Sequence, residues 1–477
     1  MKLKDIIILL FLLTSLFLFF SFTESIFVWL SFFINWGFLT GIFLYHLKVE
    51  KVYSPFLSAY ITFNYLFFLL APMVQISAFN NTSSLFPNYF PYSEGKVIYT
   101  NTMILIFHLI FFCSYLFFKK KQALKRPRIQ NQFDHRYTPL NVLLILGISI
   151  VALVMSYDYL LTLFRDSDWI TNITYKLSVS NKLILHKVLY MIPFGALVLA
   201  HSFLRKEKAI KKNKLFVFII MILLFLILIS FKNPLTEKRN AIGPIYITLL
   251  FLFQPKLLNT NTKSFLFLFL SLVVFFPLVS GLTHVDAPID EIISNPKLIV
   301  DHFKEQGFVE IFNTLHYDAF ANVMATIDYV SKTGVSYGYQ ILSGLLFFVP
   351  RSIWTSKPYS TGQVIGDYVI EDYGFEYNNL SNPLVAEGYV NFGVLGVILM
   401  AYALGYFMIK FINWLQSNDP LKRIMAFYFA VHLLFLLRGD FTNGFTYFIG
   451  TLMGVLLVPK LIDKTIRMSL RKTIKRR

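Results

Sequence analysis

Long apolar runs separated by short polar segments recur along the whole chain. Such runs predict membrane-spanning helices, because about 20 mostly apolar residues cross the roughly 30 Å hydrocarbon core of a bilayer. The pattern predicts twelve spans, at residues 6–22, 26–47, 55–77, 97–118, 139–163, 183–203, 215–231, 241–253, 265–283, 385–411, 424–437 and 441–459. The predicted fold class is therefore an all-α polytopic membrane protein of about twelve transmembrane helices.

The basic residues gather in every second connection. If the N-terminus is inside, the inner segments hold 30 of the 44 Lys and Arg residues, eight of them in the tail 460–477. Cytoplasmic loops carry an excess of Lys and Arg, so we predict that both termini are cytoplasmic. The chain is 56% hydrophobic and 15% charged, with a net charge of +18. The topology accounts for this charge, so no nucleic-acid partner is expected.

The eighth predicted span, residues 241–253, is short for a crossing. It is kept as a span because otherwise every later segment would change sides and the basic tail would face outward. On this map Lys232, Lys238 and Arg239 lie in a short outer loop, and Arg438 lies at another outer helix end. These positions break the charge rule. Each could be a snorkelling side chain that reaches the headgroups, or together they could form a site.

A polar segment of about a hundred residues interrupts the apolar pattern late in the chain. Residues 281–391 hold 13 of the 26 acidic residues and only five basic ones, among them Arg351 and Lys357. The stretch "IFNTLHYDAFANVMATIDYV" has helical periodicity with a polar stripe. "YQILSGLLFFVP" predicts an interfacial or re-entrant helix ended by Pro350. We expect this large, partly helical extracytoplasmic loop to fold back over the outer face as a lid.

Three basic clusters that are far apart in sequence fall at one predicted depth. They are Lys238 with Arg239, Arg351 with Lys357, and Arg438. Arginine binds phosphate through paired, charge-assisted hydrogen bonds. Cations at the lipid–water boundary suit a pyrophosphate whose lipid tail lies in the bilayer, and an acidic, aromatic lid suits a sugar chain. The pattern therefore points to a lipid-pyrophosphate-linked saccharide.

The C-terminal half resembles the Wzy-type polymerases of O-antigen and capsular repeat units. The motifs that carry the resemblance lie within about residues 230–445, namely "EKRNAIGP", "HYDAFANVMATIDYV", "VPRSIWTSKP", "NPLVAEGYVNFGVLGVILMAYALGY" and "RGDF". The architecture, with one dominant late outer loop, is also similar to that family. The resemblance implies a location in the bacterial cytoplasmic (inner) membrane.

The resemblance further implies a membrane glycosyltransferase. It would polymerise undecaprenyl-pyrophosphate-linked oligosaccharide repeat units, which serve as both donor and acceptor, on the outer face of the membrane. No metal or other cofactor is expected. Membrane lipid is an expected partner, and a chain-length regulator is left open as another.

Chemical roles follow from what this transfer needs. Fixed cations would hold the departing pyrophosphate; the candidates are Arg239, Arg351 and Arg438, with Lys238 and Lys357 in support. A base must accept the proton of the acceptor hydroxyl. Glu387 is one candidate, although a helix-start carboxylate is also stabilised by the helix dipole. Asp318, on the polar helical stripe, is the other, and a merely solvated helix face is its alternative.

Three other functions compete with this interpretation. A flippase or other transporter would usually show repeated halves and short loops, which this chain lacks. An O-antigen ligase-like transferase shares the architecture and the lipid donor, and only its acceptor would distinguish it. A structural scaffold would not need outer basic residues that converge.

The predicted organisation has five parts. Residues 1–231 form a scaffold of N-terminal transmembrane helices, and residues 232–283 form an outer basic loop with short spans. Residues 284–384 form the lid loop with its interfacial helix. Residues 385–459 form the C-terminal transmembrane helices, and residues 460–477 form a basic cytoplasmic tail.

Overall fold

The computed structural model describes most of the chain, and all of its regular structure there is helical. The described residues are 2–79, 86–123, 139–155, 179–205, 211–232, 239–275, 312 and 314–475. Within them the side chains of 78–79, 123, 179–188, 211–213, 239–241 and 470–475 are not described. The α-helices of the first half are α1 (Leu3–Ser21), α2 (Ile26–Leu44), α3 (Pro55–Tyr65), α4 (Ala71–Phe79), α5 (Glu94–Ala123), α6 (Pro139–Met155), α9 (Val179–Leu204), α10 (Lys211–Phe231), α11 (Arg239–Phe253) and α12 (Asn261–Phe269). Those of the second half are α16 (Ala319–Thr333), α17 (Tyr339–Leu345), α18 (Thr361–Tyr373), α19 (Leu384–Leu415), α20 (Pro420–Arg438), α21 (Phe441–Thr451) and α22 (Val458–Lys475).

The apolar runs form helices, as the sequence predicts, and the protein is a multi-pass helical membrane protein. Eight helices of the described ranges are long and apolar enough to cross a bilayer: Leu3–Ser21, Ile26–Val49, Pro55–Ser77, Glu94–Gln122, Lys214–Phe231, Leu384–Leu415, Pro420–Arg438 and Phe441–Ser469. The other four predicted spans correspond to shorter apolar helices, at Pro139–Met155, Leu189–Leu204, Ile242–Phe253 and Asn261–Phe275. Several of the long helices contain a π-helical turn, such as Leu66–Leu70 between α3 and α4.

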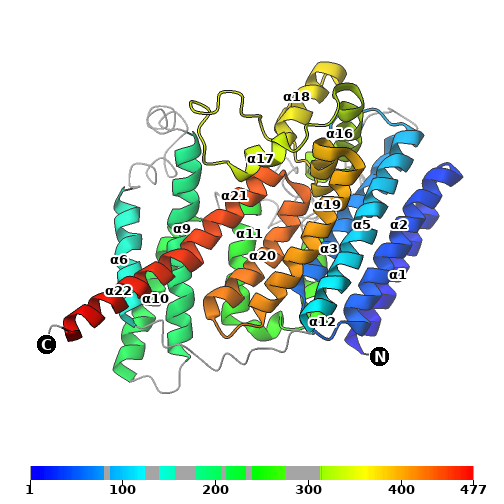
Figure 1. Cartoon of the computed structure of the whole chain (residues 1–477). Helices are drawn as coiled ribbons and strands as arrows, with labels where there is room; N and C mark the ends of the chain where they lie inside the picture. The colour runs from blue at the N-terminus through cyan, green and yellow to red at the C-terminus, as the bar shows by residue number, and fades with distance from the viewer. Residues whose placement is uncertain are drawn as a thin grey trace, which may run out of the picture.

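The helices form a bundle whose two ends differ. Both chain termini lie toward one end, and α16, α17 and α18 form a layer at the opposite end (Figure 1). Within the bundle, the helix Pro55–Ser77 is central, because 89% of its most apolar stretch is buried, against 28% for Leu3–Ser21. The face of α1 that points away from the bundle carries exposed apolar side chains such as Phe17 and Phe20, as expected for a lipid-facing helix.

Close helix contacts in the bundle occur where side chains are small. A Cβ atom at Gly405 of α19 would lie 2.2 Å from Ser114 Oγ of α5, so only glycine allows this approach. The hydroxyl of Ser114 donates a hydrogen bond to the carbonyl of Tyr402 across the same contact, at 2.8 Å. In the same way Gly195 of α9 lies against the backbone of Val455.

Helix α19 begins with a sharp reversal that the sequence analysis missed. The backbone leaves helical geometry at Phe392 and at Gly393, whose φ of +60° favours glycine. The first turns of α19 fold against its second part, because a Cβ at Gly396 would lie only 1.8 Å from the carbonyl oxygen of Gly388. The glycines of this segment therefore serve close packing within one helix, and they set the position of Glu387.

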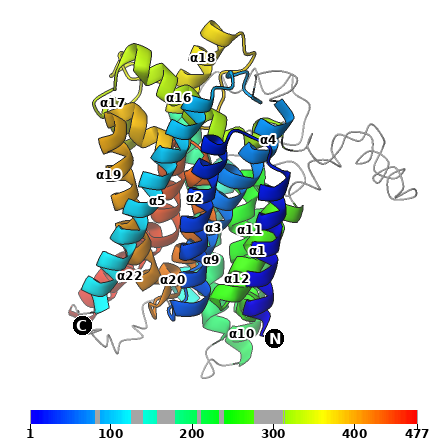
Figure 2. The same cartoon turned by 90° about the vertical axis from the view of Figure 1, so that its right-hand side faces the viewer.

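The predicted interfacial helix is shorter than expected. The sequence predicts that it ends at Pro350, but α17 ends at Leu345 and a series of turns follows. The ammonium group of Lys357 donates hydrogen bonds to the carbonyls of Leu346, Phe347 and Val349, at 2.9–3.0 Å. Since these carbonyls are satisfied by a side chain, the segment does not need another helical turn. Figure 2 shows α17 at the lateral edge of the bundle, above the upper end of α19.

Candidate functional site

The turn between α20 and α21, with the sequence Arg438-Gly-Asp-Phe441, is where the candidate residues meet. Arg438 is the last residue of α20, and the N–H of Gly439 bonds back to the carbonyl of Phe435 at 2.7 Å. Asp440 begins α21 by accepting the N–H of Asn443 at 2.8 Å, as an N-cap aspartate does. The chain thus reverses within two residues at the end of the bundle that carries the α16–α18 layer (Figure 1).

Arg438 contacts Asp318, so a predicted phosphate ligand and a predicted base form one ion pair. One guanidinium nitrogen lies 3.4 Å from Asp318 Oδ1 and donates to the carbonyl of Leu315 at 2.7 Å. The carboxylate of Asp318, at the start of α16, is buried. Burial raises the pKa of Asp318, and the charge of Arg438 opposes the shift without cancelling it.

Arg438 retains unused binding capacity. Its Nε atom is buried and has no hydrogen-bond partner among the described residues. The side chain as a whole is 26% exposed, and the guanidinium lies 5.8 Å from the centre of the Phe67 ring. A buried donor without an acceptor is costly, so this guanidinium is suited to an anionic ligand that approaches the end of the bundle.

Glu387 binds the other side of the same turn. Its Oε1 atom accepts the backbone N–H of Phe441 at 2.7 Å and the hydroxyl of Thr361. Thr361 is the first residue of α18, and Glu387 lies in the first turn of α19. The buried carboxylate therefore connects three helices at the turn. Asp318 contacts Arg438, and Glu387 contacts Phe441. Two carboxylates that are far apart in sequence therefore bind residues only three positions apart in the turn.

The polar stripe of the predicted lid helix is buried, not solvated. Asn322 accepts a hydrogen bond from Asn88 at 2.5 Å and donates one to the carbonyl of Ser381 at 2.6 Å. The hydroxyl of Thr326 donates to Asn382 at 3.0 Å. These contacts fix α16, and with it Asp318, against two polar segments of the same layer. Sequence reasoning did not identify Asn88 or Asn382, because both lie in polar stretches without a periodic pattern.

Arg351 and Lys357 are occupied within their own segment. Arg351 donates to the carbonyls of Lys357 and Pro358, the latter at 3.1 Å, and its guanidinium lies 4.0 Å from the centre of the Tyr359 ring. Lys357 binds the three carbonyls that follow α17. Burial and the neighbouring Arg351 lower the pKa of Lys357. No contact of the described residues joins this pair to Arg438 or Asp318.

The third basic cluster is only partly within the described residues. Lys238 lies outside them, and of Arg239 only the backbone is described, at the start of α11. One turn further, a Cβ at Gly243 would lie 3.8 Å from the ring of Phe435, one turn before Arg438. The beginning of α11 and the end of α20 therefore lie at a similar level in the bundle.

A second charged cluster, centred on Asp328 of α16, was not predicted. Asp328 forms an ion pair with Lys96 of α5 at 2.8 Å and accepts hydrogen bonds from the hydroxyls of Tyr368 and Tyr373. Lys332 joins the same cluster and contacts Asp372 at 2.7 Å. Although burial alone would raise it, the pKa of Asp328 is held well below its usual range by these donors. The cluster attaches the α16–α18 layer to α5.

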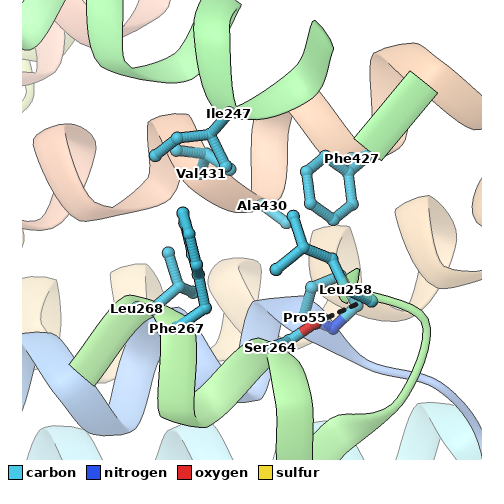
Figure 3. A pocket seen from close by; sticks show the side chains of 9 residues that line it. All are labelled: Pro55, Ile247, Leu258, Ser264, Phe267, Leu268, Phe427, Ala430 and Val431. Atoms are coloured by element: carbon cyan, nitrogen blue, oxygen red, sulfur yellow. Dashed lines mark hydrogen bonds between the residues drawn. The ribbon is translucent and has the colours of Figure 1, made fainter. Parts of the chain in front are cut away.

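One small apolar cavity lies within the helix bundle of the described structure. A cavity of about 10 Å³, which is about the room that one water needs, lies among Pro55, Ile247, Leu258, Ser264, Phe267, Leu268, Phe427, Ala430 and Val431 (Figure 3). It is unsuited to a saccharide. Within the described ranges, no group of three or more His, Cys, Asp and Glu residues is placed to hold a metal ion.

Comparisons with known protein families, curated proteins and solved structures give no match.

Proposed function

We propose that this protein is a membrane glycosyltransferase that polymerises undecaprenyl-pyrophosphate-linked oligosaccharide repeat units into a surface polysaccharide. In this proposal the twelve predicted spans cross a bacterial cytoplasmic membrane, with both termini in the cytoplasm. The α16–α18 layer is then part of the extracytoplasmic lid. The reaction takes place where that layer meets the turn between α20 and α21.

The observation that carries the proposal is the arrangement around Arg438. Its guanidinium pairs with the buried Asp318 and keeps a buried Nε–H without an acceptor in the described structure. A cation and a carboxylate are thus adjacent at the end of a membrane bundle. A pyrophosphate with its tail in the bilayer needs such a cation at this depth, and a sugar hydroxyl that attacks beside it needs such a carboxylate.

The proposed reaction assigns a role to each group. The acceptor hydroxyl attacks the anomeric carbon of the donor, its proton passes to the carboxylate of Asp318, and the bond between that carbon and the pyrophosphate oxygen breaks. Arg438, together with Arg239 at the start of α11 and the preceding residue in the sequence, Lys238, stabilises the charge that develops on the leaving pyrophosphate. Glu387 positions the turn through Phe441 and Thr361.

Arg351 and Lys357 take a structural role in this proposal, because their donors already bind main-chain carbonyls. A substitution separates the two roles. Glutamine at Arg351 keeps N–H donors for the carbonyls but removes the charge. We expect Arg351→Gln to retain polymerase activity. If Arg351 instead bound the pyrophosphate, loss of its positive charge would abolish that activity.

The direct test is polymerisation by the purified, full-length protein in liposomes with a defined undecaprenyl-pyrophosphate-linked repeat unit. We expect a ladder of longer glycans. Arg438→Ala and Arg239→Ala should abolish the ladder, and size-exclusion chromatography should show that both variants are folded. Arg467→Ala is the matched control, since Arg467 is exposed and pairs only with Asp463 of its own helix in the described structure.

The outcomes distinguish the competing functions. A single transfer to another acceptor, without a ladder, would support a ligase-like transferase. Movement of the lipid-linked saccharide across the membrane without covalent change would support a flippase. A full ladder in both Arg438→Ala and Arg239→Ala would exclude the assigned site.

A further inference from the structure

Exposed apolar side chains are concentrated in the short segment 337–359, which contains α17 and the turns after it. Seven large hydrophobic residues there are at least 38% exposed, namely Tyr337, Tyr339, Leu342, Leu345, Phe348, Ile353 and Tyr359. Ile353 is 77% exposed. In the rest of the described segment 314–383, Tyr377 alone is an exposed large hydrophobic residue. A cluster of this kind marks a surface that contacts something apolar.

The segment has a defined conformation, so its apolar residues are held outward. The indole N–H of Trp354 donates to the hydroxyl of Tyr339 at 3.0 Å, and that hydroxyl contacts the carbonyl of Ser356 at 2.9 Å. The contacts of Arg351 and Lys357 with local carbonyls close the same loop. Side chains therefore satisfy several backbone carbonyls of this loop, which favours an apolar environment.

Contacts with one candidate membrane helix, α21, fix the level of the segment. Gly344 of α17 lies against Phe441 and Thr442, at the beginning of α21, and the ring of Phe347 lies 6.3 Å from that of Phe445. Both contacts are at the first turns of a candidate span. The segment therefore lies at the membrane boundary and not above it.

The segment is also continuous with a lipid-facing surface. Gly338 packs on the ring of Phe392, at the kink of α19. Below the kink, exposed apolar side chains continue along α19. These are Val394, Leu395, Leu399, Tyr402, Tyr406 and Phe407. Figure 2 shows α17 at the level of the upper end of this helix, and Figure 1 shows α17 close to the upper end of α21.

We propose that residues 337–359 form an interfacial anchor that inserts into the headgroup–acyl boundary of the adjacent lipid leaflet. The composition fits this partner: Tyr and Trp are enriched at that boundary, where their rings are apolar and their polar atoms meet water. The basic residues Arg351 and Lys357 are suited to the headgroup level. The anchor fixes the position of α17, and through it the start of α21, relative to the bilayer. It does not depend on the proposed enzymatic activity.

Spin-label accessibility in liposomes tests the anchor. The full-length protein with Cys113→Ser receives one cysteine, at Ile353 or Phe348, and a nitroxide label. Oxygen concentrates in the bilayer and a nickel chelate in water. We expect oxygen to relax the labels at both positions strongly and the chelate weakly. Tyr377→Cys is the matched control, because Tyr377 is 58% exposed in the same layer but lies outside the segment. Its label should be relaxed strongly by the nickel chelate and weakly by oxygen.

Two results would overturn the anchor. Labels at Ile353 and Phe348 that meet the nickel chelate as readily as the label at Tyr377 would place the segment in water. Labels shielded from both reagents would indicate a protein contact. A second copy of the chain would then be identified by dipolar broadening that disappears when labelled protein is diluted with unlabelled protein. Using two positions keeps the test decisive if one variant fails to fold.

Discussion

Glu387 and Asp318 are both buried carboxylates at one turn, yet their contacts differ in kind. Glu387 accepts hydrogen bonds from a backbone N–H and a hydroxyl, and neither donor is charged. Asp318 faces the guanidinium of Arg438. A neutral amide oxygen could replace the first carboxylate as an acceptor, but no amide could accept a proton in place of the second. This difference separates positioning from base catalysis.

Amide substitutions at these two positions should therefore have unequal effects. We expect Glu387→Gln to keep most of the polymerase activity, because the amide oxygen still accepts from Phe441 and Thr361, and Glu387→Ala to lose most of it. Asp318→Asn should lower kcat by roughly 10²–10⁴-fold, the usual contribution of a general base. The rate of ladder formation at saturating substrate measures both. An inactive Glu387→Gln variant together with an active Asp318→Asn variant would show that Glu387 is the base and Asp318 the positioning residue.

The protonation of Asp318 predicts a pH dependence. Burial raises the pKa of this carboxyl above the ordinary value of about 3.9. A base acts in its deprotonated form, so activity should fall as the pH decreases through the raised pKa. We expect kcat/KM to show an acid limb above the ordinary aspartate range. The residual activity of Asp318→Asn should lack this limb; an unchanged limb in that variant would assign it to another group.

Helix α19 shows how a single element combines a membrane crossing with a site. Its second part is the apolar span, and its first turns fold back at Phe392 and Gly393 to bring Glu387 to the turn after α20. The reversal depends on the contact of Gly388 with Gly396, where even one additional carbon atom would overlap the backbone. The position of Glu387 in the site therefore depends on glycine at residues 388 and 396, where no side chain blocks the contact.

Alanine at Gly396 should displace these first turns. The added Cβ would lie 1.8 Å from the carbonyl oxygen of Gly388, so the reversal must open. Glu387 would then lose the hydrogen bond that it accepts from the N–H of Phe441. We expect a lower melting temperature and the loss of polymerisation. Gly147→Ala in α6 is the control, since nothing lies within 4 Å of its added Cβ and alanine favours helix. Equal melting temperatures for the two variants would contradict the reversal.

The Asp328 cluster holds the α16–α18 layer to α5, and its loss should loosen that layer. Asp328→Asn should destabilise the protein by about 1–3 kcal/mol, because it leaves buried donors without a charged acceptor. Lys96→Met should cost less, since Lys96 is 36% exposed and water screens it. Thermal unfolding followed by tryptophan fluorescence measures both, and the double variant should cost less than the sum. Asp372→Asn, on the exposed side of Lys332, is the control.

The same cluster predicts how this attachment responds to acid. The pKa of Asp328 in the folded protein is lowered, so its stabilising effect is present above the ordinary aspartate pKa. The effect is lost as the pH falls toward the folded value. The gap in melting temperature between the native protein and Asp328→Asn should therefore narrow as the pH decreases below about 4. A gap that widens on acidification would contradict the assignment.

For the molecule as a whole, the local pattern of the sequence predicts the helices better than their contacts. Apolar runs predicted the long apolar helices of the bundle, and the polar stripe predicted α16. Neither pattern predicted α18 or the continuation of α22 through the basic tail. The pair of Asp318 and Arg438, by contrast, joins residues 120 positions apart, and tertiary packing alone brings them together. Hydropathy likewise gave no sign that Lys357 would satisfy carbonyls after α17, because a loop lysine has the same pattern whether it binds a phosphate or its own backbone.

The sidedness of the whole molecule depends on α11, the shortest of the proposed crossings. Its 15 residues extend about 22 Å, less than the roughly 30 Å hydrocarbon core, so the bilayer must thin or its ends must lie in the headgroups. A crossing by α19 puts the α16–α18 layer and the connection between α19 and α20 on opposite sides, and a crossing by α11 decides which of the two is outside. The excess of Lys and Arg in the predicted inner segments then places the connection between α19 and α20 in the cytoplasm.

Single cysteines in a Cys113→Ser background test this arrangement in intact cells. Glu376 and Asn418 are both exposed, one beside α18 and the other between α19 and α20. A membrane-impermeant maleimide should label Glu376→Cys in intact cells and Asn418→Cys only after permeabilisation. The reverse labelling pattern would show that the protein has the opposite orientation in the membrane. The positively charged tail would then lie outside the cell, against the charge rule. Labelling of both positions in intact cells would mean that α19 does not cross, and a site at the outer boundary would lose its basis.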